Sequence, residues 1–248
     1  MQAIFRSILA LLALSLSPLT AQPAQPRLVF ATDPTQPPME FFGPHKKIIG
    51  FDLDMIQAAS KAAGFKADIR STPWDGIFSG LAAGRYDAVL CSVNITDERA
   101  KTMDFSQPYM DTGLAILVRK DTGDITGLAQ FAGKKVGAAA GTVSADAVAS
   151  QKDIELKTYN DNDESMLDDL GAGRIDAAVM DEVAAIQFAR KDKRYSNKFI
   201  ITGGRLQPGK FGIAVRKGDQ KTLDLINKGL EAITQDGTLD RLTTKWLK

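Results

Sequence analysis

A fixed positive charge close to small polar side chains makes one stretch of the sequence a candidate carboxylate-binding site. A short apolar strand is predicted over residues 87–92, followed by polar side chains that include Ser92 and Asn94. Thr96 predicts the N-cap of the next helix, which places Arg99 in its first turn. Open α/β sheets bind ligands at this end of their strands, and a guanidinium fork suits a carboxylate. Taken alone, the stretch is explained equally well by an arginine on a solvated helix face.

The pattern that leads into this strand occurs a second time in the chain. The run Leu-Ala-Ala-Gly-Arg-Tyr-Asp-Ala-Val-Leu at residues 81–90 is matched by Leu-Gly-Ala-Gly-Arg-Ile-Asp-Ala-Ala-Val at residues 170–179. Each copy predicts the end of a helix, a glycine that stops it, and a buried strand. One unit then presents Arg99 and the other Asp181, so a ligand held between them would carry a carboxylate and an ammonium. An alternative role for Asp181 is to cap the helix predicted over residues 182–190.

The composition excludes several classes of function. The chain has 248 residues, 44% of them hydrophobic, which is enough for one large domain or two modest ones. Its 31 basic and 30 acidic residues leave no net field that favours nucleic acid or an anionic membrane. The single cysteine, Cys91, cannot form an internal disulfide, and the single histidine, His45, leaves a metal cluster or a Ser-His-Asp triad incomplete. No P-loop or GxGxxG follows a strand, which argues against nucleotide binding, and we expect no cofactor and no metal.

The N-terminus has the pattern of a secretory signal peptide. Arg6 precedes an apolar run at residues 8–16 that is too short to span a bilayer, and small residues follow the run. We therefore expect residues 1–21 to be removed by cleavage after Ala21, with Ala24 as the alternative site, and the protein to be periplasmic.

Strands and helices alternate along the rest of the chain, which predicts an α/β fold. The first strand, residues 27–32, ends at Asp33, which is either a ligand-side residue or a turn residue before proline. Trp74 lies in a strand-to-helix loop, where it is either a core plug or an aromatic wall of a pocket. Thr142 predicts a helix cap, and free amides at that helix end suit an anion. Further predicted strands are 66–71, 115–118, 154–159, 199–202 and 211–215, and further predicted helices lie between Gly50 and Gly64 and over 164–170, 220–235 and 239–247.

Five motifs follow one another in order along the chain. They are Gly50-Phe-Asp-Leu-Asp, Ser92-Val-Asn-Ile-Thr-Asp-Glu-Arg, Asp104-Phe-Ser-Gln-Pro-Tyr, Gly141-Thr and Met180-Asp-Glu-Val-Ala-Ala. In this order they resemble the periplasmic solute-binding proteins of family 3, which serve ABC importers of polar amino acids. The resemblance implies a type II periplasmic-binding-protein fold, in which two α/β lobes joined by two crossing strands close on the ligand by hinge bending.

This resemblance also implies boundaries for the two lobes. We expect residues 27–112 and 206–248 to form the first lobe and residues 113–205 to form the second. The hinges are expected near residues 111–114 and 202–206, where Gly113, Gly203 and Gly204 would allow large backbone changes.

The same resemblance implies roles for individual residues. The arginine that matches Arg99 binds the ligand α-carboxylate in that family, and the acid that matches Asp181 binds the α-ammonium. An aromatic residue matching Trp74 flanks the ligand, and an acid matching Asp33 meets its side chain, which makes a basic amino acid one option among polar ligands. The residues that surround the α-carboxylate match Ser92, Asn94, Thr142 and Val143. The implied partners are an amino acid ligand and a membrane permease, with no nucleic acid, and the protein is expected to be a monomer.

Five positions depart from the family pattern, two of which are Asn94 and Val143, where hydroxyl residues are commoner. Gln36 stands where many members have a stacking aromatic residue, and Met39 where they often have phenylalanine, which leaves Trp74 as the main wall. Cys91 stands at a position that is often small and polar, and we expect a buried, unpaired thiol there.

The resemblance leaves an enzymatic function as an alternative on the same fold. Some related proteins dehydrate cyclohexadienyl acids with a carboxylic acid that lies three residues beyond the position of Asp181. Ala184 occupies that position here, so we expect a binding protein and not an enzyme. A sensory ligand-binding protein is the third option.

Overall fold

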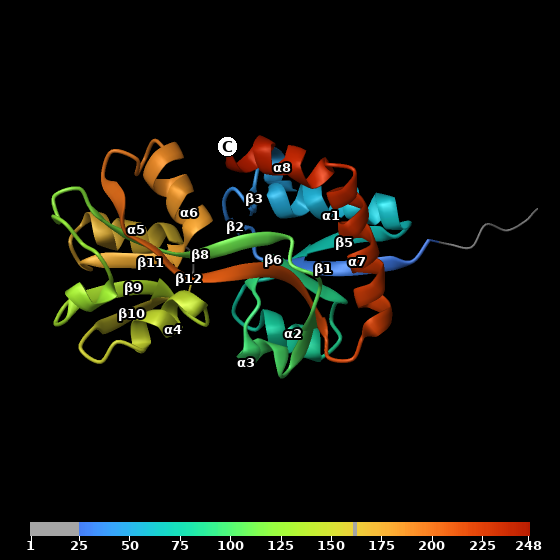
Figure 1. The fold of residues 1–248 in the computed structure, drawn as a ribbon, viewed down its shortest axis with the longest axis horizontal. Helices are drawn as coiled ribbons and strands as arrows, with labels where there is room; N and C mark the ends of the chain where they lie inside the picture. Colours follow the sequence, from blue (N-terminus) through green and yellow to red (C-terminus); the bar gives the residue numbers. More distant parts are fainter. Residues whose placement is uncertain (1–24, 161–162) are drawn as a thin grey trace, which may run out of the picture.

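The structure is a computed structural model that describes residues 25–160 and 163–248. The predicted signal peptide, residues 1–21, lies outside the described residues. Two α/β lobes lie side by side, and two long strands run between them (Figure 1).

One large mixed sheet extends through both lobes. Its strands are β1 (Arg27–Thr32), β5 (Lys66–Ser71), β6 (Ala88–Asn94), β7 (Met103–Phe105), β8 (Met110–Arg119), β9 (Lys135–Ala139), β10 (Glu155–Tyr159), β11 (Ala177–Asp181) and β12 (Phe199–Arg216). They follow the order β10-β9-β11-β8-β12-β6-β1-β5, and β7 pairs with β12. The β1, β5 and β6 strands are parallel in one lobe, as are β9, β10 and β11 in the other. A small sheet in the first lobe contains β2 (Thr35–Gln36), β3 (Glu40–Phe42) and β4 (Ile48–Ile49).

Helices cover the sheet in each lobe, and each lobe has its own buried core (Figure 1). The first lobe carries α1 (Phe51–Ala63), α2 (Ile77–Ala82), α3 (Asp97–Ala100), α7 (Gln220–Gln235) and α8 (Thr238–Leu247). The second lobe carries α4 (Val143–Ala149), α5 (Asp163–Gly171) and α6 (Glu182–Ile186), which continues into a π-helical turn, Gln187–Lys191. Phe30 and Phe51 are fully buried in the first core, as is Phe188 in the second. Separate cores explain how two lobes form from one chain.

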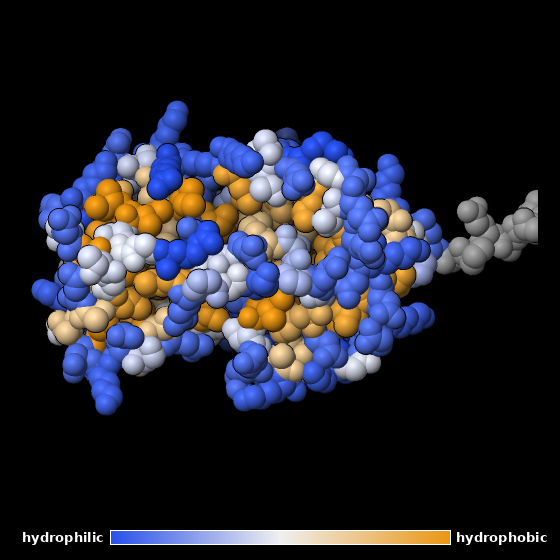
Figure 2. Space-filling model, in the orientation of Figure 1, coloured by the Kyte–Doolittle hydropathy of each residue, from blue (hydrophilic) through white to orange (hydrophobic). Residues whose placement is uncertain are grey.

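Figure 2 shows hydrophilic residues around the rim of one face, with hydrophobic residues between them. Among the described residues, Phe42 and Ile200 are the large hydrophobic side chains that are exposed. None of the helices in the described ranges is long and apolar enough to cross a membrane.

One sequence prediction about the crossing strands is wrong. Residues 199–202 and 211–215 were expected to be separate strands around a Gly/Pro-rich loop, but they belong to the continuous 18-residue strand β12. The intervening residues pair with β8, because Leu206 lies opposite Leu114 and Gly209 lies opposite Thr112. Pairing with a long neighbouring strand therefore overrides the local preference of glycine and proline for a turn.

The pairing of β12 with β8 is irregular at the expected hinge. Its register shifts between Thr202 and Leu206, where Gly203 and Gly204 have φ of 73° and 68°. These two glycines adopt a conformation that other residues rarely adopt. Gly113 does not have a positive φ, and an added Cβ there would lie 2.5 Å from Cγ of Arg205. The glycine on β8 therefore makes room for a side chain of β12.

Gly50 allows the start of α1 to pack closely against the segment that precedes β3. Its φ is 140°, and an added Cβ would lie 2.1 Å from the backbone oxygen of Met39. The Asp52 amide donates a 3.0 Å hydrogen bond to the same oxygen. This close approach brings Glu40, the residue after Met39, next to the first turn of α1.

We expect Gly50→Ala to lower the free energy of unfolding by more than about 2 kcal/mol, because the new Cβ overlaps backbone atoms that cannot move aside cheaply. Gly64→Ala is the matched control, since Gly64 also has a positive φ, 81°, but has open space around it. It is expected to cost only about 1 kcal/mol. Urea unfolding measures both variants, and equal losses would contradict this explanation.

Candidate functional site

A cavity of about 260 Å³ lies between the two lobes. Every candidate ligand-binding residue from the sequence lines it: Asp33, Gln36, Trp74, Cys91, Ser92, Asn94, Arg99, Thr142, Val143 and Asp181. Met39 is buried in the core of the first lobe and is not among the lining residues of this cavity. The cavity also has lining residues that the sequence analysis missed: Thr35, Asp75, Gly76, Phe78, Ala139, Ala140, Gly141, Tyr159, Asn160 and Asp163. The predicted residues thus share one site, and their contact with a ligand stays a prediction.

Arg99 is positioned by groups from both lobes. Thr96 caps α3 as predicted, because its Oγ1 accepts a 3.2 Å hydrogen bond from the Arg99 amide. The guanidinium donates to the backbone oxygen of Asn94 (2.9 Å) and, across the cleft, to that of Gly141 (3.2 Å). Burial lowers the pKa of Arg99, whereas the charge of Asp181 raises it. Arginine remains charged under such conditions, and its remaining N–H groups are suited to a carboxylate.

Two aromatic rings also contact the Arg99 guanidinium. Its Cζ lies 5.5 Å from the ring centroid of Trp74 and 5.1 Å from that of Phe78. The two rings are perpendicular, with centroids 5.0 Å apart. Such cation–π contacts stabilise a desolvated cation. Trp74 is therefore both a wall of the cavity and a packing residue, and Phe78 is a second aromatic residue four positions further along the chain.

Asp181 precedes α6 but does not cap it through its side chain. Its Oδ1 instead accepts a 3.0 Å hydrogen bond from the side-chain amide of Asn94, which belongs to the other lobe. Burial raises the pKa of Asp181 to about 6, even though the Asn94 hydrogen bond and the Arg99 charge oppose this rise. Asp181 is thus the N-cap residue of α6, as the alternative role expected, but its carboxylate makes no capping hydrogen bond and is held by Asn94 instead.

Thr142 begins α4 on the second lobe, as predicted. Its Oγ1 accepts a hydrogen bond from the Ala145 amide (3.3 Å) and donates one to the backbone oxygen of Ala139 (2.7 Å). These two bonds hold the small-residue loop from Ala139 to Val143 against the cavity. The loop provides the Gly141 oxygen that Arg99 contacts.

Asp33 lies just beyond β1 and supports the loop that contains Trp74. Its Oδ2 accepts a 2.6 Å hydrogen bond from the Trp74 amide. Burial raises the pKa of Asp33, while the hydrogen bonds from the Trp74 amide and the Thr35 side chain lower it. The Asp33 amide donates to Sγ of Cys91, 3.4 Å away. Asp33 therefore presents a carboxylate to the cavity and also positions the loop that contains Trp74.

Cys91 and Ser92 form part of the cavity wall on β6. Cys91 is a buried free cysteine, as predicted, and burial raises the pKa of its thiol well above 9.0, so it stays protonated at neutral pH. Ser92 has a φ of 44°, which is uncommon for a residue with a side chain. Its amide donates a 3.0 Å hydrogen bond to Asp52, and its Oγ lies 3.5 Å from Oε2 of Glu40. Two buried acids therefore hold this strained residue in place.

Glu40 and Asp52 form an acid pair behind the cavity wall. Both side chains are fully buried, and among the described residues no lysine or arginine forms a salt bridge with either. The hydroxyl of Tyr109 donates a 3.0 Å hydrogen bond to Asp52. Burial raises the pKa of Glu40 well above 4.5, and the charge of Asp52 raises it further. Burial also raises the pKa of Asp52 to about 6. We infer that the pair retains a shared proton.

We expect Glu40→Gln to stabilise the protein increasingly as the pH rises. The raised folded-state pKa of Glu40 contributes stability that is fully present below 4.5, the ordinary value for this group, and is lost as the pH rises through the folded-state pKa. A glutamine amide donates a hydrogen bond without titrating, so the variant should gain about 1 kcal/mol or more over the wild-type protein between about pH 5 and pH 8. Thermal unfolding at both pH values measures this gain. Glu155→Gln, at an exposed residue, is the control, and an equal offset for Glu40→Gln at both pH values would contradict the shared proton.

Comparison with known proteins identifies the family of this chain. The family described as bacterial extracellular solute-binding proteins, family 3, matches residues 28–248. The L-cystine-binding protein TcyJ of Escherichia coli (strain K12) is 34% identical over 221 residues, which cover 88% of this chain and 82% of that protein. A solved ancestral arginine-binding protein bound to arginine is 35% identical, with a TM-score of 0.84 over 90% of this chain and 99% of the other. The solved ancestral amino acid-binding protein AncCDT-1, a precursor of cyclohexadienyl dehydratase, is 32% identical, with a TM-score of 0.81 over 90% and 96%.

These similarities extend over both lobes and the crossing strands. They confirm the predicted type II periplasmic-binding-protein fold and the resemblance on which it was based. The chain belongs to the bacterial extracellular solute-binding proteins, family 3.

Proposed function

We propose that this protein binds a polar amino acid between its lobes in the periplasm and delivers it to the permease of an ABC importer. The observation that carries the proposal is the pair of opposite charges, Arg99 on the first lobe and Asp181 on the second, that line one cavity. Arg99 would bind the α-carboxylate and Asp181 the α-ammonium. The similarity to cystine- and arginine-binding proteins supports an amino acid as the ligand.

The enzymatic alternative has weaker support. AncCDT-1 is similar in fold and sequence, so a dehydratase-like activity has a structural precedent. The position where the resemblance places the catalytic acid is Ala184, which is buried in the core of the second lobe and lies outside the cavity lining. The cavity thus has Arg99 and Asp181 for the two charges of an amino acid but no acid at the position expected for catalysis. We therefore assign the protein a binding role.

We expect Arg99→Lys to lose most of its affinity for the amino acid. A lysine ammonium is a point charge, so it cannot bind the Asn94 and Gly141 oxygens and also present a fork to a carboxylate. The expected loss is about 2–5 kcal/mol, or about 30-fold or more in Kd. Isothermal titration with the amino acid identified by ligand screening measures the loss.

Arg85→Lys is the matched control, because Arg85 is exposed on the same lobe and does not line the cavity. It should bind as the wild-type protein does. An Arg99→Lys variant that keeps its affinity within about twofold would show that Arg99 is not the carboxylate anchor.

We also expect the ligand to shift the population toward a closed arrangement of the lobes. The hydrogen bonds Asn94–Asp181 and Arg99–Gly141 both cross the cleft, so the cavity is complete only when the lobes approach each other. We propose residues 111–114 and 202–206 as hinges, with residues 27–112 and 206–248 moving against residues 113–205. Small-angle scattering should show a smaller radius of gyration with saturating ligand, and an unchanged radius would indicate a rigid pocket.

A further inference from the structure

Asp163 is a buried acid in the cavity that the functions assigned above do not use. It is the first residue of α5, and its side chain belongs to the cavity lining. It is 5% exposed, and its Oδ2 has no hydrogen-bond partner among the described residues. Burial, together with the charge of Asp181 at the end of β11, raises its pKa to about 7. A buried carboxyl oxygen without a partner is costly, which indicates that the partner is a ligand group.

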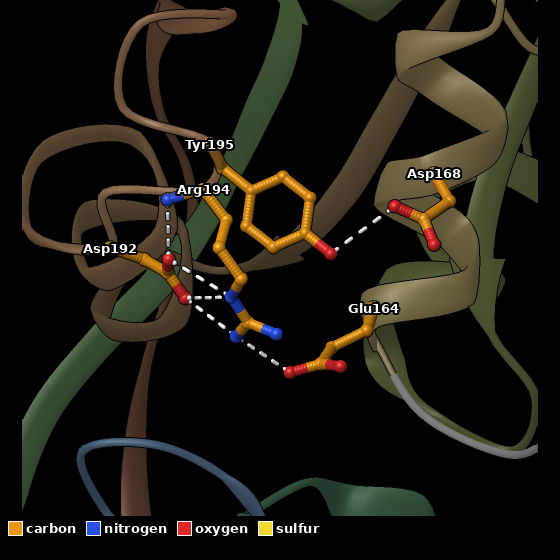
Figure 3. Close-up of polar contacts among 5 residues, drawn as sticks. All are labelled: Glu164, Asp168, Asp192, Arg194 and Tyr195. Carbon is orange, nitrogen blue, oxygen red and sulfur yellow. Dashed lines mark hydrogen bonds and ion pairs between the residues drawn. The ribbon is translucent and has the colours of Figure 1, made fainter.

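The side chains that follow Asp163 in α5 make contacts that do not involve Asp163. Figure 3 shows Arg194 between Asp192 and Glu164, with the Tyr195 hydroxyl directed toward Asp168. Arg194 Nη2 lies 2.7 Å from both Glu164 Oε1 and Asp192 Oδ2, so its charge is already paired with two carboxylates. These contacts hold α5 against residues 192–195.

The cavity has more negative than positive groups. Asp33, Asp75, Asp163 and Asp181 line it, and Arg99 is the one cationic side chain among its described lining residues. In the proposed binding mode, the carboxylate and ammonium of an amino acid pair with Arg99 and Asp181. The charge of Asp163 is then buried with no cation to balance it.

Asp33 and Asp163 differ in how much the protein itself satisfies them. The Asp33 carboxylate already accepts a hydrogen bond from the Trp74 amide, whereas Asp163 Oδ2 has no partner. The position of Asp163 in the first turn of α5 favours its anionic form when a cation is present. Of these two acids, Asp163 is thus the one that lacks a hydrogen-bond donor, which a ligand could supply.

We propose that Asp163 is a specificity-determining residue that accepts a hydrogen bond from a guanidinium or ammonium group of the ligand side chain. The site would then select amino acids with a net positive charge over neutral polar ones. This inference rests on the proposed function, because it requires Arg99 and Asp181 to be occupied by the α-groups of the same ligand.

Isothermal titration of the mature protein with L-arginine, L-lysine and L-glutamine tests this proposal. In Asp163→Asn, an isosteric change, the affinity for arginine or lysine should fall about tenfold or more, while that for glutamine stays within about threefold. Asp153→Asn is the control, because Asp153 is exposed on the same lobe and does not line the cavity, and it should change all affinities little. Equal losses for all three ligands, or no loss, would overturn the assignment.

Proton release by the wild-type protein gives a second test that does not depend on a variant. Binding of a side-chain cation should drive Asp163 fully into its ionised form, because its pKa is about 7, and so release about half a proton more at pH 7 than glutamine does. Titrations in two buffers with different ionisation enthalpies measure this difference, and equal release for both ligand classes would overturn the proposal. Binding of glutamine but not of arginine or lysine would overturn it and leave the proposed function standing. Binding of no amino acid would refute the proposed function as well.

Discussion

The structure depends on two opposite charges that face one cavity from different lobes. Arg99 donates hydrogen bonds to backbone oxygens of both lobes, and Asp181 accepts one from Asn94 across the same cleft. Because each charge is held partly by the opposite lobe, the site is assembled only where the lobes meet. A ligand that pairs with both charges would therefore favour the closed arrangement of the lobes.

Two buried acids without cationic partners, Glu40 and Asp52, support the cavity wall. Glu40 and Asp52 contact Ser92 from behind the wall, and the tight approach at Gly50 brings the two acids together. The motif at residues 50–54 lies outside the cavity but supports its wall. Its Asp52 accepts hydrogen bonds from the Ser92 amide and the Tyr109 hydroxyl. The two acids thus connect the first lobe core to the cavity wall at Ser92.

Local patterns predicted much of the fold and the polar ends of the site. The repeated Gly-Arg-x-Asp motif correctly placed Arg99 and Asp181 on separate units. It could do so because a helix end at glycine and a short buried strand are both determined by residues that are neighbours in the chain. The acid pair and the cavity position of Asp163 depend on contacts between distant segments, which periodicity does not encode. Phe78 was detectable in principle, because it follows Trp74 by four residues at the start of a helix. The continuous strand β12 was missed because its pairing with β8 overrides its turn-forming composition.

The central claim is that the site recognises the two charges of an α-amino acid at once. Thermal unfolding with each common L-amino acid identifies the ligand, since a ligand at about 100 times its Kd adds about 2.7 kcal/mol of stability. The decisive measurement then compares that amino acid with its decarboxylated amine and its Nα-acetyl derivative. Our account predicts that only the intact zwitterion raises Tm, because each analogue leaves Arg99 or Asp181 without a partner. An equal rise in Tm with either analogue would contradict it.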